Sequence, residues 1–305
     1  MKKTILITGS RGLIGTALSE RLIQKGHTVR RLVRQKTDQK DTYYWDPLAG
    51  NFDEKALVGT DCVVHLAGEP IAQRWNKKSK EAILKSRVLG TRLLVDKIKA
   101  LNSPAALIST SGINFYGAQA GYIINEDQES TPMANPGDGF LSEVCREWEQ
   151  EAQALDATKN RVVLLRTGVV LSKKGGALAR LLMPFKLGLG GVVGSGTQWM
   201  SWIELHDLVK IFIWAIEGDF SGSLNAVSPN PVQNKVFVAH LGKILKRPTV
   251  IPLPKFIVHM LFGAMGHETL LADIGVMPYT LINEGFQWEC AEINKALLKA
   301  LKDNG

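Results

Sequence analysis

KTILITGSRGLIG, residues 3–15, is the stretch from which the fold of this chain is inferred. An apolar run at residues 4–8 favours a β-strand, three glycines follow, and an apolar stripe of helical period comes next. Glycine lets the backbone approach a ligand closely, and the free N–H groups at the start of a helix attract a diphosphate. A purely structural turn is the alternative. The order strand, turn, helix favours a dinucleotide site formed by Gly9, Ser10, Arg11, Gly12, Leu13, Ile14 and Gly15.

The composition is that of a globular protein with a large core. The chain has 305 residues, of which 45% are hydrophobic. The uncharged stretch at residues 187–203 is rich in glycine and serine and too short to span a membrane, so we expect no membrane partner. Three widely spaced cysteines favour a reducing cytoplasm over a disulfide framework, and six histidines without ligand spacing argue against a metal.

The charge favours a phosphorylated small ligand. The 37 Lys and Arg residues outnumber the 29 Asp and Glu residues, which gives a net charge of +8. These basic residues are dispersed and lack interleaved aromatic residues, so we do not expect a nucleic-acid partner. The oligomeric state is left open by the sequence.

The second expected strand, residues 27–33, indicates which dinucleotide is bound. An NAD site usually has an acidic residue at the end of this strand, whereas an NADP site uses arginine against the 2′-phosphate. This chain has Arg34 there and Arg11 in the glycine turn, with no Asp or Glu between Glu20 and Asp38. A solvated strand end is the alternative for Arg34 alone. The two arginines together favour NADP(H).

Further strands are expected at residues 61–67, 105–110 and 161–167, with helices at about 79–100 and 140–155 between them. This alternation predicts an α/β fold with a doubly wound parallel Rossmann sheet and ligands at the carboxyl ends of the strands. The adenine side of the cofactor is expected to pass the end of the third strand, where Leu66 and Ala67 lead into Gly68.

The second half of the chain lacks the regular alternation of strands and helices expected in the first half. Residues 1–170 are expected to form the dinucleotide-binding domain, completed by about 204–228, and residues 171–203 and 229–305 a smaller C-terminal substrate lobe. The glycine-rich stretch that ends in Trp199 and Trp202 forms either a substrate wall or a turn with two packing tryptophans. Asp207, just before an apolar helix, is expected to be its N-cap.

With these features in place, the chain resembles an atypical extended short-chain dehydrogenase/reductase of the epimerase-like branch, often called sugar-nucleotide epimerase-like, over its whole length. The motifs that carry the resemblance include TGSRGLIG, HLAGEPI at residues 65–71, RTGVVLSKKGGAL at 166–178 and GSGTQWMSWI at 194–203. The resemblance implies NADP contacts from Gly9, Gly12, Gly15, Arg34, Ala67 and Arg87. The chain departs from the family at Glu204 and His206, where His and Asp are usual.

The usual catalytic pair is missing. Typical members use a tyrosine and a lysine four residues later, the ammonium lowering the pKa of the phenol. No such pair occurs in this chain, and Leu141 and Cys145 stand in its place. Ser111 and Tyr116 remain as catalytic candidates, although a turn hydroxyl and a packing residue are the plainer interpretations. We therefore expect an NADP-dependent oxidoreductase or epimerase with a small-molecule substrate, or else a non-catalytic NADP-binding sensor or scaffold.

Overall fold

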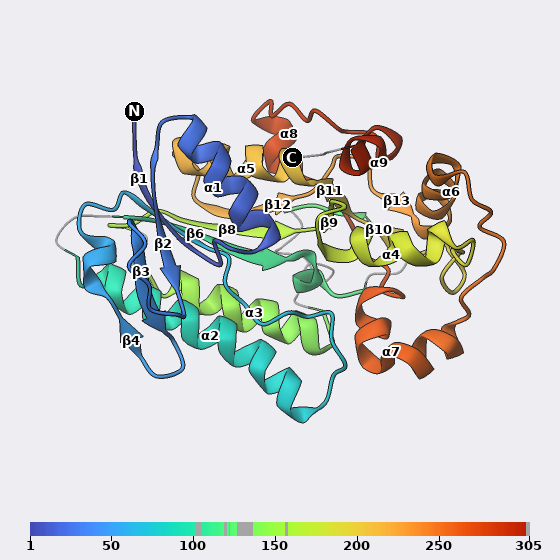
Figure 1. Cartoon of the computed structure of the whole chain (residues 1–305), viewed down its shortest axis with the longest axis horizontal. Helices are drawn as coiled ribbons and strands as arrows, with labels where there is room; N and C mark the ends of the chain where they lie inside the picture. The colour runs from blue at the N-terminus through green and yellow to red at the C-terminus, as the bar shows by residue number, and fades with distance from the viewer. Residues whose placement is uncertain (102–104, 119–120, 122, 127–136, 156–157, 303–305) are drawn as a thin grey trace.

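The computed structural model describes the chain except for residues 102–104, 119–120, 122, 127–136, 156–157 and 303–305. Its central sheet is made of β1 (Thr4–Thr8), β2 (Thr28–Val33), β3 (Thr42–Asp46), β4 (Asn51–Phe52), β5 (Cys62–His65), β6 (Ala106–Gly112), β8 (Val162–Thr167) and β12 (Gly222–Ala226). The strand order is β12-β8-β6-β5-β1-β2-β3-β4 (Figure 1). All neighbours are parallel except β3 and β4. The chain leaves β1 toward β2 and later returns to β5 on the other side of β1, which creates the crevice where such sheets bind ligands.

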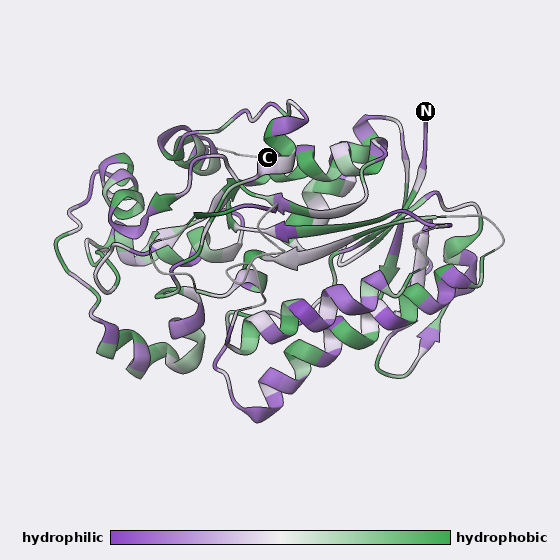
Figure 2. Ribbon diagram, turned by 180° about the vertical axis from the view of Figure 1, so that it is seen from behind, coloured by the Kyte–Doolittle hydropathy of each residue, from purple (hydrophilic) through white to green (hydrophobic). Residues whose placement is uncertain are grey.

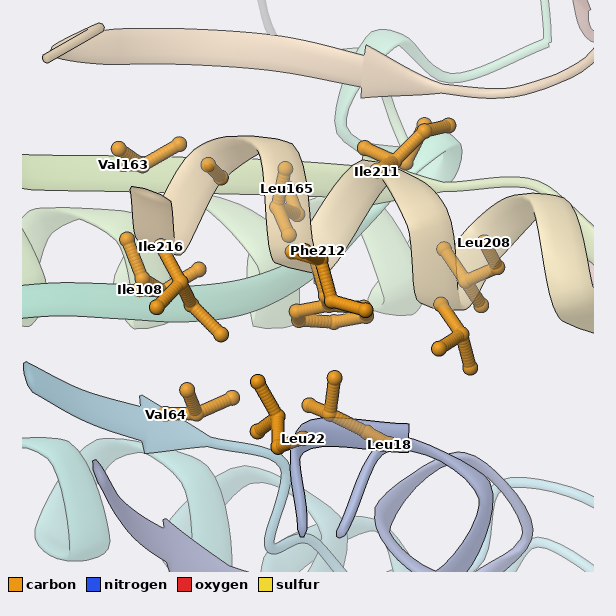
Figure 3. Close-up of a cluster of buried hydrophobic side chains, with 14 of the residues drawn as sticks. Leu18, Leu22, Val64, Ile108, Val163, Leu165, Leu208, Ile211, Phe212 and Ile216 are labelled. Carbon is orange, nitrogen blue, oxygen red and sulfur yellow. The ribbon is translucent and has the colours of Figure 1, made fainter. Parts of the chain in front are cut away.

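Helices cover both faces of this sheet. Figure 1 shows α1 (Leu13–Gln24) and α5 (Leu205–Glu217) on one face, and α2 (Lys77–Lys99) and α3 (Phe140–Gln153) on the other. Figure 3 shows Leu208, Phe212 and Ile216 of α5 in one buried cluster with side chains of the sheet and of α1. In Figure 2, α2 and α3 alternate between purple and green, as helices with one buried face do. The predicted doubly wound α/β fold is confirmed.

The sequence patterns did not predict the strands at the edge of the sheet beyond β2. The strand β3 has the sequence TYYWD and pairs in parallel with β2, and its Trp45 is buried. Aromatic residues favour strands, but five residues at a sheet edge carry little periodic signal. Their strand character becomes evident only through the pairing with β2.

The remaining elements lie mostly in the C-terminal half, at one end of the sheet (Figure 1). The helical ones are η1 (Glu54–Leu57), η2 (Ile113–Tyr116), α4 (Gly176–Lys186), α6 (Asn234–Leu245), α7 (Lys255–Thr269), α8 (Tyr279–Asn283) and α9 (Ile293–Lys302). The short strands are β7 (Ile123–Ile124), β9 (Val169–Leu171), β10 (Trp199–Met200), β11 (Trp202–Glu204), β13 (Val232–Gln233) and β14 (Gly275–Val276). A separate apolar core joins α4, α6 and α9. In the part of the chain described, no helix is long and apolar enough to cross a membrane. The domain boundaries stay a prediction.

Candidate cofactor site

The glycine turn between β1 and α1 leaves no room for side chains at two of its three glycines. Gly9 has a φ of +64°, and a Cβ there would lie 2.8 Å from the carbonyl carbon of Leu66. A Cβ on Gly15 would lie 2.3 Å from the carbonyl oxygen of Gly9. The turn can therefore pack this closely against α1 and the loop after β5 only because these positions are glycine.

The end of β1 is tied to the loop after β5 through the buried Thr8. The Thr8 hydroxyl oxygen accepts hydrogen bonds from the backbone N–H groups of Leu66 and Ala67, at 3.0 and 3.1 Å. These bonds hold residues 66–68 beside the glycine turn at the switch in strand order. The structure thus brings together the two stretches that the sequence assigned to the cofactor.

The polar side chains around this turn fit an anionic ligand. Arg34 follows β2 directly and is exposed, as is Arg11 in the turn itself. Ser10 is 5% exposed, and its hydroxyl has no hydrogen-bond partner among the described residues. A buried hydroxyl without a partner is costly, so an acceptor or donor from a ligand would be stabilising there. The residues present therefore fit a phosphorylated dinucleotide.

Arg87 of α2 lies under the loop that follows β5. It is 7% exposed, and its Nη1 donates to the carbonyl oxygens of Glu69 and Ile83, at 3.0 and 3.1 Å. A Cβ on Gly68 would lie 2.8 Å from the Arg87 Cζ, so the guanidinium packs flat against this glycine. Burial lowers the pKa of Arg87. The arginine that the family resemblance singled out is therefore adjacent to Gly68.

His65, at the end of β5, is fully buried between the rings of Trp45 and Trp148. Because the Thr8 hydroxyl already accepts two N–H groups, its own proton is free to donate to His65 Nδ1, 2.8 Å away. Burial first, and then the charge of Arg87, lower the pKa of His65 to about 3. His65 is therefore a neutral core residue that orients Thr8.

This burial predicts a loss of stability in mild acid. Between pH 6.5 and about 3 the unfolded chain binds a proton at His65 that the folded chain does not. The contribution of His65 is complete above pH 6.5 and declines as the pH falls through that range. The difference in unfolding free energy between pH 7 and pH 5, from urea titrations, should be smaller by about 2 kcal/mol in His65→Gln than in the wild type. The exposed His259→Gln is the matched control, and an unchanged difference in His65→Gln would contradict the prediction.

The positions where the family has its tyrosine and lysine are buried in this chain. Leu141 and Cys145 of α3 are 3% and 6% exposed. Burial raises the pKa of the Cys145 thiol to about 11, so it stays protonated at neutral pH. The hydroxyl of Ser111, on β6, lies beside this thiol and has no well-formed hydrogen bond among the described residues. Ser111 therefore has its hydroxyl buried beside the Cys145 thiol, and its catalytic role stays a prediction.

Tyr116 is held in a buried polar network. Its hydroxyl donates to Oδ1 of Asn225 at 2.9 Å and accepts from Nη1 of Arg166 at 3.0 Å. Arg166 in turn pairs with Glu149 of α3 through two hydrogen bonds of 3.0 and 2.7 Å. These contacts give Tyr116 a role in joining β8, β12 and α3, and the phenol would have to leave them to act on a substrate.

One carboxylate beside Leu141 was not singled out from the sequence. Glu268, at the end of α7, accepts a hydrogen bond from the backbone N–H of Leu141 at 2.8 Å, and its carbonyl oxygen accepts one from Asn114 at 3.2 Å. Gly139, the N-cap of α3, offers no side chain to cap the helix, so Glu268 takes this place. The two residues are 127 positions apart, and no local pattern connects them.

The two tryptophans proposed for a substrate wall differ in exposure. Trp202 is fully buried, belongs to the core between α4, α6 and α9, and donates through its indole N–H to the carbonyl of Asn230. This geometry favours the packing interpretation for Trp202. Trp199 is half-buried, and its backbone N–H donates to Asp273 at 2.7 Å.

The expectation that Asp207 caps α5 is wrong. The N-cap is Glu204, whose carboxylate accepts from the backbone N–H of His206. Asp207 lies inside the first turn, fully buried, and accepts from the backbone N–H groups of Glu289 and Cys290, at 2.8 and 2.7 Å. The apolar pattern places the start of α5 too late because the polar residues His206 and Asp207 follow Leu205 in the first turn.

Glu204, Asp207 and Cys290 also form a group of metal-ligand type, with their ligand atoms within 4.8 Å of one another. The hydrogen bonds just described already occupy the two carboxylates, and Nζ of Lys299 lies 3.9 Å from Glu204. Burial raises the pKa of the Cys290 thiol to about 11, which disfavours the thiolate that a metal needs. The group therefore serves to attach the C-terminal segment to α5.

Comparison with known proteins shows which family the chain belongs to. Residues 5–226 match the NAD dependent epimerase/dehydratase family, and residues 253–300 match a domain of unknown function, DUF1731. Epimerase family protein Mb2239 of Mycobacterium bovis is 38% identical over 96% of both chains. Epimerase family protein SDR39U1 of Homo sapiens is 36% identical over 96% of this chain and 98% of its own.

Solved structures of other proteins are similar to this chain in fold. The crystal structure of human SDR39U1 (isoform 2) with NADPH is similar to this chain at a TM-score of 0.89 and 34% identity, over 98% of this chain and 99% of the human one. UDP-N-acetylglucosamine 4-epimerase from Bacillus cereus has a TM-score of 0.73 at 16% identity, over 100% and 97% of the two chains, and shares the fold. The chain belongs to the NAD dependent epimerase/dehydratase family.

Proposed function

We propose that this chain is an NADP(H)-dependent oxidoreductase or epimerase that acts on a small carbonyl compound or a nucleotide sugar. The observation that carries the proposal is the exposed Arg34 at the end of β2, next to a glycine turn with the unpaired Ser10 hydroxyl. An exposed arginine at this place suits a 2′-phosphate rather than ribose hydroxyls. The human relative, crystallised with NADPH, supports the same cofactor.

The cofactor would supply hydride chemistry, and the chain would hold the substrate and move a proton. Ser111 is the stronger of the two catalytic candidates, because Tyr116 is engaged by Asn225 and Arg166. Glu268 is a carboxylate near the vacated tyrosine position and could accept the proton of a substrate hydroxyl. The half-buried Trp199 remains the candidate for a substrate contact. The three buried free cysteines support a reducing compartment such as the cytoplasm.

The Arg34→Ala variant tests the cofactor. We expect it to weaken NADPH binding by about tenfold or more, because a charge-assisted contact to the 2′-phosphate is lost, and to leave NADH binding unchanged. Isothermal titration with both cofactors measures this, with the exposed Arg247→Ala as the matched control. Should Arg34→Ala keep the wild-type preference for NADPH, the 2′-phosphate is read by another residue, of which Arg11 is the first to test.

A non-catalytic NADP-binding sensor or scaffold is the second candidate. Its specific support is the apolar Leu141 and the protonated Cys145 at the two positions that carry proton chemistry in typical members. A screen for cofactor oxidation and reduction against nucleotide sugars and small carbonyl compounds separates the two. Tight NADPH binding without turnover across that screen favours the sensor.

A further inference from the structure

Acidic residues are absent from two long stretches in the second half of the chain. Residues 157–203 and 220–267 contain no Asp or Glu, although lysines and arginines continue through both. The fold brings the two stretches together, because Gly191 and Val193 form β-bridges with Val250 and Leu253. Residues 183–194 and 243–261 therefore share one surface, which has no carboxylate of its own and is called here the basic-apolar surface.

The cations of the basic-apolar surface are not neutralised. Those that are exposed are Lys186, Lys243, Lys246, Arg247 and Lys255. None of them has an ion-pair partner among the described residues. Lysines elsewhere do have such partners, for example Lys25 with Glu217 and Lys97 with Glu54. The positive charge of this surface is thus available to an anionic partner.

Large apolar side chains are exposed among these cations. They are Leu187 and Leu189 after α4, Val250 and Ile251 before α7, and Phe256 and Met260 on α7. Phe256 and Met260, which are one helical turn apart, are 70% and 71% exposed. The only buried residues of α7 are Val258 and Gly266, although most of the helix is apolar. Both α4 and α7 lie at the end of the molecule away from β3 and β4 (Figure 1). Exposed apolar side chains gathered in this way indicate a binding surface.

The composition of this surface favours a lipid bilayer over a protein partner. Four of its five exposed cations are lysine, and lysine is depleted in protein interfaces. Lysine beside exposed Phe and Leu is typical of segments that lie at a membrane surface. The long lysine side chain can reach headgroup phosphates while its apolar neighbours enter the acyl boundary.

We propose that the basic-apolar surface attaches this protein to the surface of a bilayer that contains anionic lipids. Phe256 and Met260 enter the boundary between headgroups and acyl chains, and the neighbouring cations bind the headgroup phosphates. The expectation of no membrane partner was based on the lack of a spanning segment, and attachment to a bilayer surface does not need one. The attachment is independent of the proposed cofactor.

Cosedimentation with vesicles tests the charge. We expect the wild type to bind vesicles of equal parts phosphatidylcholine and phosphatidylglycerol about tenfold or more tightly than vesicles of phosphatidylcholine alone. Each cation near an anionic surface contributes about fivefold to binding, so the triple variant Lys246→Glu, Arg247→Glu, Lys255→Glu should bind the mixed vesicles about a hundredfold more weakly. The control triple Lys40→Glu, Lys77→Glu, Lys78→Glu makes the same change in net charge at exposed lysines outside this surface and should bind like the wild type.

A second pair of variants tests the apolar contact. Phe256→Ser with Met260→Ser should weaken binding to the mixed vesicles by about tenfold or more, because the apolar area that enters the bilayer is lost. Leu48→Ser with Val58→Ser is the matched control, since these side chains are 68% and 69% exposed and lie outside the basic-apolar surface. Melting without vesicles checks that each variant is folded.

Four results would overturn the attachment. They are a wild type that does not bind the mixed vesicles, equal weakening by the two charge triples, unchanged binding by the Phe256 and Met260 variant, and a wild-type dimer that this variant dissociates. The first would leave a protein partner as the occupant of the surface, the second would reduce the effect to net charge, and the third would exclude apolar insertion. The fourth, read by analytical ultracentrifugation, would make the surface an interface between two copies of this chain. None of these readouts involves NADPH, so each of these failures leaves the proposed function in place.

Discussion

Replacing Arg166 with methionine is expected to lower the free energy of unfolding by about 3–5 kcal/mol. Arg166 and Glu149 are 1% and 3% exposed and share two hydrogen bonds of 3.0 and 2.7 Å. The guanidinium also lies 3.5 Å from the ring centroid of Phe115 and donates to the Tyr116 hydroxyl. The variant leaves the Glu149 carboxylate buried without this partner, which costs far more than the pair itself contributes.

Urea unfolding of a small set of variants measures this effect. Arg92→Met is the matched control, because Arg92 pairs with Glu151 from a side chain that is 53% exposed, and its loss should cost about 1 kcal/mol or less. The double variant Glu149→Met with Arg166→Met removes both buried charges and is expected to recover a large part of the stability. If Arg166→Met and Arg92→Met lose equal stability, the buried network does not hold α3 to β8 as inferred.

Replacing Gly15 with alanine is expected to weaken NADPH binding by about a hundredfold or more, because small displacements of a binding loop misplace several contacts at once. The new Cβ would lie 2.3 Å from the Gly9 carbonyl oxygen and 2.7 Å from the Cα of Ser10. Both are backbone atoms, so the turn itself must shift. A lower melting temperature of the unliganded protein should accompany the loss of binding, which isothermal titration measures.

Gly12→Ala is the matched variant within the same turn. Gly12 has an ordinary φ of −79°, and a Cβ there would lie 3.2 Å from one carbonyl oxygen. We expect this variant to melt close to the wild type, so that any weakening of NADPH binding by it reports on the close approach of the ligand to the backbone. Gly15→Ala with wild-type affinity for NADPH would show that the diphosphate is bound elsewhere.

The sheet could be predicted well because its signals are local. Each buried parallel strand is a short apolar run followed by glycine or a polar residue, and each covering helix has an apolar stripe, so residues 4–24 already specify strand, turn and helix. Two errors in the elements also have local causes. The edge strand β3 is too short for a periodic signal, and the polar pair His206 and Asp207 obscured the start of α5 at Leu205.

The sequence by itself determined the fold class, the glycine turn and the position of the arginine at the end of β2. Each of these follows from strand, turn and helix signals that depend on a few neighbouring residues. Only the tertiary structure decided what the polar side chains contact. Tyr116 meets Asn225 across 109 residues, and Leu141 meets Glu268 across 127. Arg87 could be assigned to the loop after β5 only once α2 was packed on the sheet. Such contacts depend on how elements far apart in the chain pack together, which no periodicity within a single element can specify.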